Sequence, residues 1–424
     1  MDRIKVEIKK LGRVADSVIE IAPLMIFSGE SGMGKSYLAL LVHYFYDVLI
    51  NSDRQSRLSY LFETLGYDYK EMAKNFNGEG IAFTIRKKEL ENWMEKDAVT
   101  YLRFMLNSEN LEGQIAVSLP NTIPDKIEFG YKEVKTGIIN NEKTEIMLNA
   151  GNIHYRVSQS AFNDVTPYAA ILAAFLIDCL YGKIDALQST FNMPPSRGPV
   201  LSESVIGNSG MYKDFIADVI DLSNVPSNPK TLSKPLMDQL FSIMEGEVKK
   251  ENNRFVYLTN GVSMPISAAA SSIREIAPLQ ILASKWDISR TAVLIEEPEA
   301  HLHPNKQRMM ADLVGCVLKA GACVHLTTHS DYFLRRINEL ILFQRFADKH
   351  NEDEIQQLSE KTGIKLSFSI NANDAIAYLV RRQTDGSSKV VAQDLKDGVP
   401  FTAFSNAVKE SLRINDILEE ALEQ

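Results

Sequence analysis

LMIFSGESGMGKS, residues 24–36, is the stretch that decides how this chain folds. Its four leading apolar residues are typical of a short buried strand, and residues 37–42 (YLALLV) continue the loop as a helix. The loop between them fits the pattern GxxxxGK[ST]. In that pattern, glycines let backbone N–H groups turn toward phosphates, and the start of the helix adds the positive end of its dipole. The stretch therefore predicts a strand, a phosphate-binding loop and a helix in direct succession.

The side chains of this loop have separate predicted roles. Lys35 is expected to reach the β- and γ-phosphates of ATP, and the Ser36 hydroxyl is expected to ligate Mg²⁺. The remaining predicted nucleotide-binding positions are Gly29, Ser31, Gly32 and Gly34. A chance match in a Gly/Ser-rich turn is the alternative, and the flanking strand and helix count against it.

A second apolar run, Ala292–Ile295, ends in the two carboxylates Glu296 and Glu297. Apolar residues followed by two acids form the Walker B pattern, in which one acid belongs to the Mg²⁺ shell and the next orients or deprotonates the attacking water. We assign Glu296 to the metal and Glu297 to the water. The alternative is an ordinary solvated strand end that carries acids.

A third strand, predicted at residues 324–328, ends at His329. A histidine at such a strand end can hydrogen-bond the γ-phosphate and fix the water, so we predict a catalytic role for His329. His325 lies roughly 13 Å back along the same strand, which is too deep for the phosphate. We therefore expect His325 to be a core residue.

Together these motifs resemble those of ABC-type ATPase heads. The wording IEEPEAHLHP, residues 295–304, is especially similar to the overcoming-lysogenization-defect (OLD) ATPases and to related stand-alone phage-defence ATPases, including the ATPase subunit of the PARIS system. The stretch Pro194–Arg197 resembles a Pro-x-x-Arg element of the same group. The resemblance implies an ATP-hydrolysing head, with ATP and Mg²⁺ as cofactors.

The resemblance also implies a signature motif that caps the γ-phosphate of an opposite subunit. The candidate is residues 267–275, SAAASSIRE, in which Ser271 or Ser272 would present a hydroxyl and a helix N-terminus to phosphate. Ile273 is a departure, because family members usually carry glycine near this position. The alternative is an ordinary serine N-cap on a buried helix. Gln159 is the candidate for the glutamine that ligates Mg²⁺ in such heads. Alternatively, Gln159 is an ordinary residue exposed to water at a strand end.

The pattern of elements predicts one α/β unit over residues 1–424, a P-loop NTPase of ABC-ATPase type. A central parallel sheet is expected, and residues 1–50 and 255–345 are expected to form the nucleotide-binding core. Helices and an antiparallel β-subdomain are expected within residues 51–165, with strands near residues 81–85, 115–117, 127–129, 146–148 and 154–157. A helical lobe is expected at 166–254. Residues 346–424 are expected to complete the head, with a strand at 364–370 and a helix at 403–422.

Composition and charge limit which classes of protein the chain can belong to. The 424 residues carry a net charge of −9, with 45% hydrophobic and 24% charged residues, which is ordinary globular composition. Three cysteines give no disulfide framework, and no apolar segment reaches the length of a membrane span, so we expect a cytoplasmic protein without a membrane partner. The acidic balance disfavours coating of nucleic acid by bulk charge. Charge runs such as Arg335-Arg336 are expected to be solvated.

These expectations lead to an ATP-dependent switch with slow turnover, in which two or more copies sandwich ATP. Its favoured role is the sensor ATPase of an anti-phage defence system that controls a separate toxin or nuclease, since residues 350–424 hold no D-x-D pair of a Toprim nuclease. A repair-type ATPase that acts on DNA is the first alternative. It is disfavoured because the span of about 235 residues between Lys35 and Ser271 lacks the sustained heptads of a coiled coil. A nucleotide-locked scaffold is the second alternative.

Overall fold

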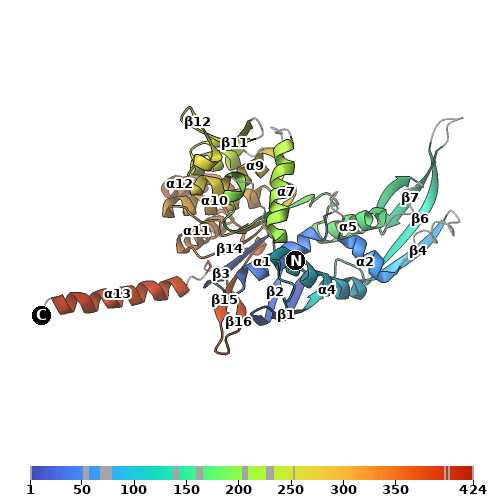
Figure 1. The fold of residues 1–424 in the computed structure, drawn as a ribbon, viewed down its shortest axis with the longest axis horizontal. Helices are drawn as coiled ribbons and strands as arrows, with labels where there is room; N and C mark the ends of the chain where they lie inside the picture. Colours follow the sequence, from blue (N-terminus) through green and yellow to red (C-terminus); the bar gives the residue numbers. More distant parts are fainter. Residues whose placement is uncertain are drawn as a thin grey trace.

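The structure is a computed structural model of the chain, and the figures show it as one elongated body with two projections (Figure 1). It describes residues 2–50, 57–66, 79–136, 143–158, 166–202, 209–225, 234–251, 254–395, 398–399 and 402–422. No helix within these ranges is long and apolar enough to cross a lipid bilayer.

A nine-stranded sheet forms the centre of the molecule. Its strands, in spatial order, are β5 (Gly113–Ser118), β1 (Lys5–Leu11), β2 (Val14–Glu20), β16 (Ser388–Ala392), β15 (Ala375–Arg382), β3 (Leu24–Gly29), β14 (Cys323–Thr328), β13 (Thr291–Glu296) and β9 (Ser189–Met193). From β15 to β9 each strand is parallel to its neighbour. The three strands that carry the sequence motifs, β3, β14 and β13, are therefore adjacent and end at the same edge.

The apolar run of β3 is buried on both faces, which explains why it shows no alternation with polar residues. Met25 and Phe27 belong to a core shared with helix α1 (Lys35–Asp47). Leu24 and Ile26 point to the other face, into a core shared with helices α9 (Ser271–Lys285), α10 (Pro304–Lys319) and α11 (Asp331–Ala347). The sheet thus has a helical layer on each side, which fixes the positions of its strand ends.

A four-stranded antiparallel sheet extends from the first of these cores, on the right of Figure 1. Its strands are β4 (Glu79–Arg86), β6 (Lys126–Thr136), β7 (Lys143–Ala150) and β8 (Ile153–Ser158), and the helices on its inner side are α2 (Leu58–Leu65), α4 (Lys87–Leu106) and α5 (Thr166–Tyr181). Phe83 and Phe129 stack at 4.5 Å between ring centroids and join the sheet to this helical layer.

A helical lobe covers the other core, at the top of Figure 1. It consists of α6 (Gly198–Ser202), α7 (Gly210–Asn224), α8 (Lys234–Met244) and α9, with a small antiparallel sheet of β10 (Glu247–Glu251), β11 (Arg254–Thr259) and β12 (Val262–Pro265). The predicted class, α/β with a central parallel sheet, an antiparallel β-subdomain and a helical lobe, is confirmed.

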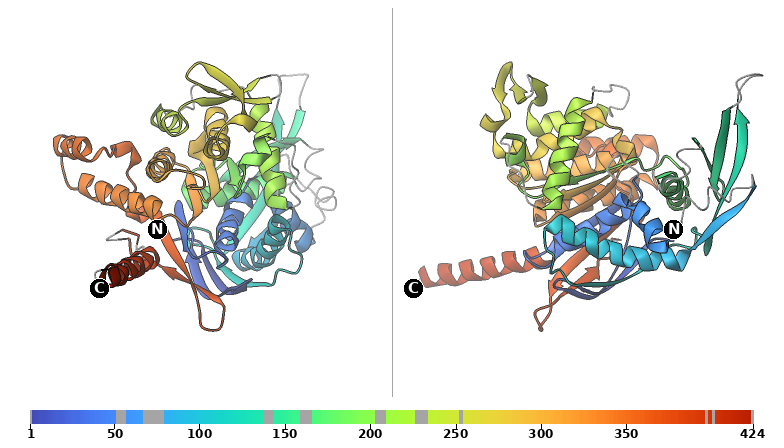
Figure 2. Two further views of the ribbon diagram at one scale, coloured as in Figure 1. Left: turned by 60° about the vertical axis from the view of Figure 1, so that its left-hand side comes forward. Right: turned by 45° about the vertical axis from the view of Figure 1, so that its right-hand side comes forward.

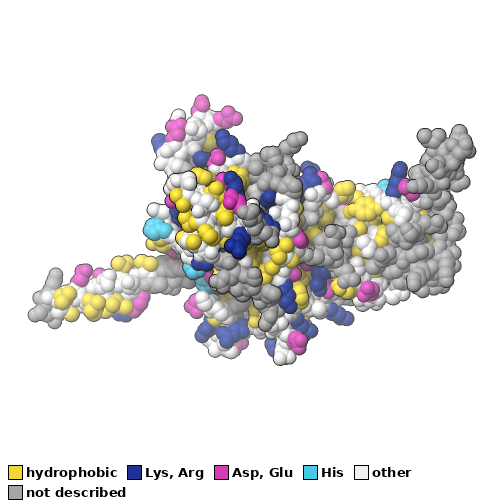
Figure 3. Space-filling view, turned by 45° about the horizontal axis from the view of Figure 1, so that its top comes forward, with side chains coloured by type: hydrophobic (Ala, Val, Ile, Leu, Met, Phe, Trp, Pro, Cys, Tyr) yellow, Lys and Arg dark blue, Asp and Glu magenta, His cyan; other side chains and the backbone are white. Residues whose placement is uncertain are grey.

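The final segment returns to the central sheet and then leaves the body. Helix α12 (Glu352–Thr362) precedes β15 and β16. Helix α13 (Thr402–Leu422) projects away from the rest of the chain, as Figure 1 and the right-hand view of Figure 2 show. Apolar side chains are exposed along it, including Leu412 and Leu418 at 56% each, and they appear as a yellow band in the space-filling view (Figure 3).

Some details differ from the sequence-based expectation. Strand β5 belongs to the central sheet, where it pairs with β1, and not to the β-subdomain. Within 166–254, α5 packs on β7 and β8, and β9 joins the central sheet beside β13. The strand expected at 364–370 is instead a 3-10 turn, η4 (Leu366–Phe368), because Phe368 and Ile370 are held by the core over α10 and α11 and not by a neighbouring strand.

Gly315 tests the close approach of α10 to η4. A Cβ at this position would lie 1.9 Å from the carbonyl oxygen of Phe368. Gly315→Ala should therefore lower the free energy of unfolding by about 3 kcal/mol, the upper end of overpacking costs. Gly182→Ala is the control, because its left-handed φ of 73° costs about 1 kcal/mol while no atom lies nearby. Urea titration measures both; equal losses would contradict the close packing.

Candidate functional site

The loop that is predicted to bind phosphate depends on the backbone freedom of its glycines. Gly29, Gly32 and Gly34 all have φ in the left-handed region, at 129°, 73° and 98°. A Cβ at Gly29 would also lie 2.4 Å from the carbonyl oxygen of Val380 on the neighbouring strand, so glycine is needed there for space as well as for backbone freedom. Ser31 and Gly32 are exposed at the mouth of the loop.

Lys35 lies at the first position of α1 and is only 6% exposed. Its Nζ donates to the carbonyl oxygens of Gly29 and Glu30, at 3.0 and 2.8 Å. Burial lowers the pKa of Lys35 to about 8, although the carboxylates of Glu297 and Glu296 act in the opposite direction. The amine is thus held inside the loop, where the phosphates of a nucleotide are expected.

Glu296 is the centre of the polar network at this sheet edge. Its Oε2 accepts hydrogen bonds from Ser36 Oγ at 3.0 Å and from Thr327 Oγ1 at 2.7 Å. The residue is 2% exposed, and burial raises the pKa of its carboxyl group. Its other oxygen, Oε1, is buried without a hydrogen-bond partner among the described residues.

This arrangement fits a divalent cation. A buried carboxylate oxygen without a partner is costly unless a cation or a donor satisfies it. Oxygen ligands from one carboxylate and one hydroxyl, completed by water and phosphate oxygens, are what Mg²⁺ prefers. Glu296 and Ser36 are therefore the residues that would hold Mg²⁺. Gln159, the third predicted metal ligand, lies outside the described residues.

Glu297 follows the end of β13 in an unusual backbone conformation. Its φ is 47°, in the left-handed region, which costs a residue with a side chain about 1–2 kcal/mol. Its N–H donates to the carbonyl oxygen of Thr327 at 3.1 Å, which holds the turn against β14. The side chain is 44% exposed and lines the cavity, so it is accessible to water.

His329 lies opposite Glu297 at the end of β14. The two side chains approach to 3.8 Å between Nε2 and Oε1. Burial lowers the pKa of His329, and the charge of Lys35 acts in the same direction. The lowered pKa favours the neutral imidazole, in which one ring nitrogen donates and the other accepts.

Glu299 is a residue that sequence reasoning missed. It is 8% exposed, and its Oε1 accepts from Thr328 Oγ1 at 2.8 Å and from the His329 N–H at 2.6 Å. Burial raises its carboxyl pKa. Glu299 thus fixes the backbone that carries His329. The only sequence signal was a third acid three residues after Glu296.

These side chains surround a cavity of about 360 Å³. It is lined by Gly12, Arg13, Ser31, Gly32, Gly34, Lys35, Ser36, Tyr37, Glu296, Glu297, Thr327 and His329. Gly12, Arg13 and Tyr37 were not predicted; they come from the β1–β2 turn and from α1, which only the fold brings together. The cavity therefore joins most of the predicted nucleotide-binding and catalytic residues.

Ser271 and Ser272 do not line this cavity. They form the first turn of α9 in the helical lobe, and Ser271 is exposed. Ala270 is the N-cap residue and makes no side-chain cap bond, so the serines do not cap the helix. Ile273 is buried in the lobe core at 8% exposure, which leaves the helix N-terminus open despite the branched side chain.

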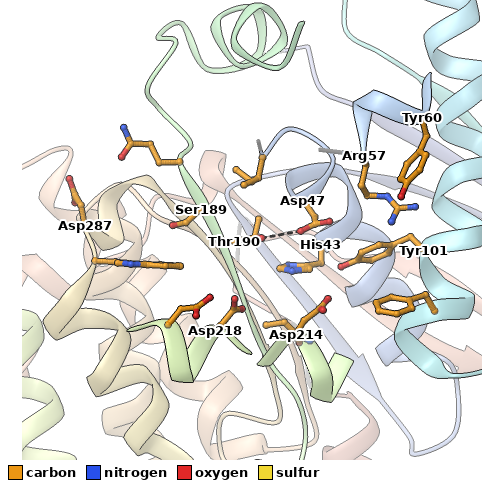
Figure 4. A pocket seen from close by; sticks show the side chains of 16 residues that line it. His43, Asp47, Arg57, Tyr60, Tyr101, Ser189, Thr190, Asp214, Asp218 and Asp287 are labelled. Atoms are coloured by element: carbon orange, nitrogen blue, oxygen red, sulfur yellow. Dashed lines mark hydrogen bonds between the residues drawn. The ribbon is translucent and has the colours of Figure 1, made fainter. Parts of the chain in front are cut away.

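A larger cavity, of about 1000 Å³, lies at the opposite end of α1 (Figure 4). Asp47, the last residue of α1, lines it and accepts a hydrogen bond from Thr190 at 3.2 Å. Asp214, Asp218 and Asp287 also line it. Carboxylates repel phosphate groups, and Asp47 lies about 18 Å from Lys35 along α1. It is therefore not the nucleotide site.

Two histidines inside the molecule are core residues. His325 is fully buried, shares a hydrogen bond of 2.8 Å with His43, and stacks on Tyr46. The core position expected for His325 is thus confirmed. Arg336 corrects the expectation that its charge run is solvated, because it is 6% exposed and pairs with Asp312 at 2.6 Å.

Comparison with protein families finds a match over part of the chain. Residues 212–334 match the family described as AAA ATPase domain, and this range includes Ser271, Glu296, Glu297 and His329. The match covers less than half of the chain. No curated protein matches the sequence.

Several solved structures are similar to the chain. They include an SmcHead bound to the C-winged helix domain of ScpA, with 12% identity, a TM-score of 0.38, and coverage of 93% of this chain and 98% of that chain. An SMC head domain from Thermotoga maritima has 10% identity, a TM-score of 0.33, and coverage of 93% and 100%. An Smc head domain with an extended coiled coil, bound to the C-terminal domain of ScpA derived from Pyrococcus furiosus, has 14% identity, a TM-score of 0.38, and coverage of 97% and 100%. These TM-scores are low, so the similarity assigns no role to any residue of the site.

The pKa of Lys35 predicts how ATP binding depends on pH. Phosphate groups favour the charged form of the Lys35 amine. Above about pH 8 the amine of the free protein is neutral, so ATP binding must then take up a proton. The affinity for Mg–ATP should be constant from pH 7 to 8 and then fall by up to about tenfold per pH unit. Calorimetry with a non-hydrolysable analogue measures this. Lys35→Met should bind Mg–ATP weakly, and its affinity should not fall above pH 8. A wild-type affinity that stays constant to about pH 9.5 would contradict the role of Lys35 as a phosphate ligand.

Proposed function

We propose that this protein is a Mg²⁺-dependent ATPase that works as a molecular switch through an ATP sandwich between two copies. The observation that carries the proposal is the convergence of three strand ends on one cavity. β3 supplies Lys35 through its loop, β13 supplies Glu296 and Glu297, and β14 supplies His329. Such a set can bind a triphosphate, hold its metal and position a water.

The residues divide the work of hydrolysis. Lys35 and the loop N–H groups hold the β- and γ-phosphates of ATP, and Ser36 and Glu296 hold the metal ion. Mg²⁺ neutralises charge that develops on the phosphate oxygens. Glu297 orients the water and takes up its proton as the new O–P bond forms and the bond to ADP breaks. His329, neutral and fixed by Glu299, donates a hydrogen bond to the γ-phosphate.

The dimer is proposed because the candidate signature is open and remote from its own site. The N-terminus of α9 is exposed on the lobe, and Ser271 and Ser272 are absent from the lining of the cavity. A helix N-terminus with free N–H groups favours an anion, and the γ-phosphate bound by a second copy is such an anion. With two nucleotides held in this way, the two copies would assemble when ATP binds and separate when it is hydrolysed.

Glu297→Gln tests the sandwich. This variant should bind Mg–ATP but not hydrolyse it, so that dimers accumulate. Light scattering should show a doubling of mass on addition of Mg–ATP to Glu297→Gln. Lys35→Ala, which lacks the phosphate ligand, is the matched control and should show neither binding nor a change in mass. Binding of ATP by Glu297→Gln without any change in mass would contradict an ATP-dependent dimer.

We further propose that the switch is the sensor ATPase of an anti-phage defence system, with a separate toxin or nuclease as effector. The similarity of residues 295–304 to the OLD and PARIS ATPases supports this role. If it is correct, cells that carry the gene with its genomic neighbours should reduce phage plating efficiency by at least about tenfold. The Glu297→Gln variant, which stops the hydrolytic cycle, should change that protection. Equal plating with wild type and with an empty vector, over a broad phage panel, would contradict the role.

A further inference from the structure

Arg197 is the largest fully buried side chain in the described part of the protein, at 1% exposure. It does not line the nucleotide cavity. Its Nε donates to the carbonyl oxygen of Glu275 at 2.7 Å, and its Nη1 donates to the carbonyl oxygens of Pro194 at 3.1 Å and Glu296 at 2.8 Å. One guanidinium therefore ties together three segments: the loop after β9, helix α9 and the end of β13.

The carboxylate of Glu275 completes this connection from the α9 side. It accepts the backbone N–H groups of Arg197 and Gly198, at 3.1 and 3.0 Å, and lies 3.6 Å from Nε of Arg197. Glu275 is 3% exposed and stands one helical turn after Ser271. A rigid helix transmits movement of its first turn to the next, so displacement of the α9 N-terminus moves the partner of Arg197.

The contact with Glu296 reaches the catalytic residues. The carbonyl oxygen that accepts from Arg197 belongs to the peptide group that joins Glu296 to Glu297. Glu297 has a φ of 47°, a strained conformation that its surroundings must hold. A shift of that carbonyl changes the direction in which the Glu297 carboxylate points. A misplacement of about 1 Å costs a catalytic group up to about a hundredfold in rate.

We propose that Arg197 is a positioning residue that couples the seating of helix α9 to the orientation of Glu297. The inference rests on the proposed function, in which α9 of one copy caps the ATP of the other. Because α9 and Glu297 of a single chain would then serve two different ATP sites, the Arg197–Glu275 pair would connect those sites. Occupation of one site should promote hydrolysis at the other, which appears as cooperative turnover.

A matched pair of lysine substitutions separates this role from simple stabilisation. Arg197→Lys keeps the charge but cannot reach three carbonyl oxygens with a planar fork. Arg336→Lys makes the same change at another buried ion pair. Arg336 donates to Asp312 and Glu339, and among the described residues it makes no hydrogen bond or ion pair with β13. Both variants should lower the thermal midpoint by similar amounts.

The steady-state rate as a function of ATP concentration gives the decisive readout. For Arg197→Lys, we expect kcat to fall by about 10- to 100-fold and the Hill coefficient to fall from near 2 toward 1, with the affinity for a fluorescent ATP analogue within about twofold of wild type. For Arg336→Lys, we expect kcat and the Hill coefficient to stay within about twofold of wild type. Glu275→Gln removes the ion pair but keeps an acceptor, and it should lower kcat and the Hill coefficient as Arg197→Lys does. It replaces Arg197→Lys as the test if that variant does not fold.

Measurements on the wild type distinguish a failure of the coupling from a failure of the proposed function. Hydrolysis that Glu297→Gln abolishes would establish the ATPase independently of Arg197. With that established, the coupling is overturned if Arg197→Lys keeps its kcat and Hill coefficient, if Arg336→Lys loses them equally, or if wild-type turnover is not cooperative. A wild type that does not hydrolyse ATP would overturn the proposed function, and the coupling with it.

Discussion

The hydrogen bond from Ser36 to Glu296 is the contact on which the site depends. It joins the start of α1 to the end of β13 at 3.0 Å, although 260 residues separate the two partners. Thr327 on the intervening strand bonds the same carboxylate oxygen. These three groups meet only if β3, β14 and β13 are parallel, adjacent and in register, so the central sheet is a direct requirement of the chemistry. The other oxygen of Glu296 remains buried and without a partner among the described residues, which is why a cation fits there.

The same strand ends carry the features that position the reacting groups. Glu297 projects from a left-handed turn held by Thr327, and His329 follows a backbone fixed by Glu299. The lobe reaches this edge through the buried Arg197. A conformational change in the lobe therefore has a short route to the water-positioning residue. In the proposed switch, this architecture would make hydrolysis sensitive to the position of helix α9.

Much of the site was predictable because its chemistry requires fixed spacing in sequence. The loop residues up to Lys35 and Ser36, the pair Glu296–Glu297 and the strand ending in His329 are local patterns, and each has the position that its pattern indicates. The fold class followed from the same patterns, since a strand, a phosphate loop and a helix favour a parallel sheet.

The remaining features depend on contacts between distant segments. Arg13 reaches the cavity only because the β1–β2 turn lies against Tyr37 at the start of α1. Arg336 looked like part of a solvated charge run, but Asp312 on the neighbouring helix allows its burial. The segment 364–370 has the apolar content of a strand, yet it packs on α10 as a 3-10 turn because no strand partner is available to it among the described residues. Pairing partners of this kind are not encoded in local periodicity.

Cross-linking tests the central claim, the ATP sandwich, most directly. Ser31→Cys in the phosphate loop and Ser271→Cys at the start of α9, introduced together on a Glu297→Gln background, should be joined between two copies by a short bismaleimide when Mg–ATP is present. Ser263→Cys, exposed on β12, replaces Ser271→Cys in the control and should give only the background of the native cysteines. The account predicts a covalent dimer that requires both Ser271→Cys and ATP. Cross-linking that is independent of ATP, or absent while ATP is bound, would contradict it.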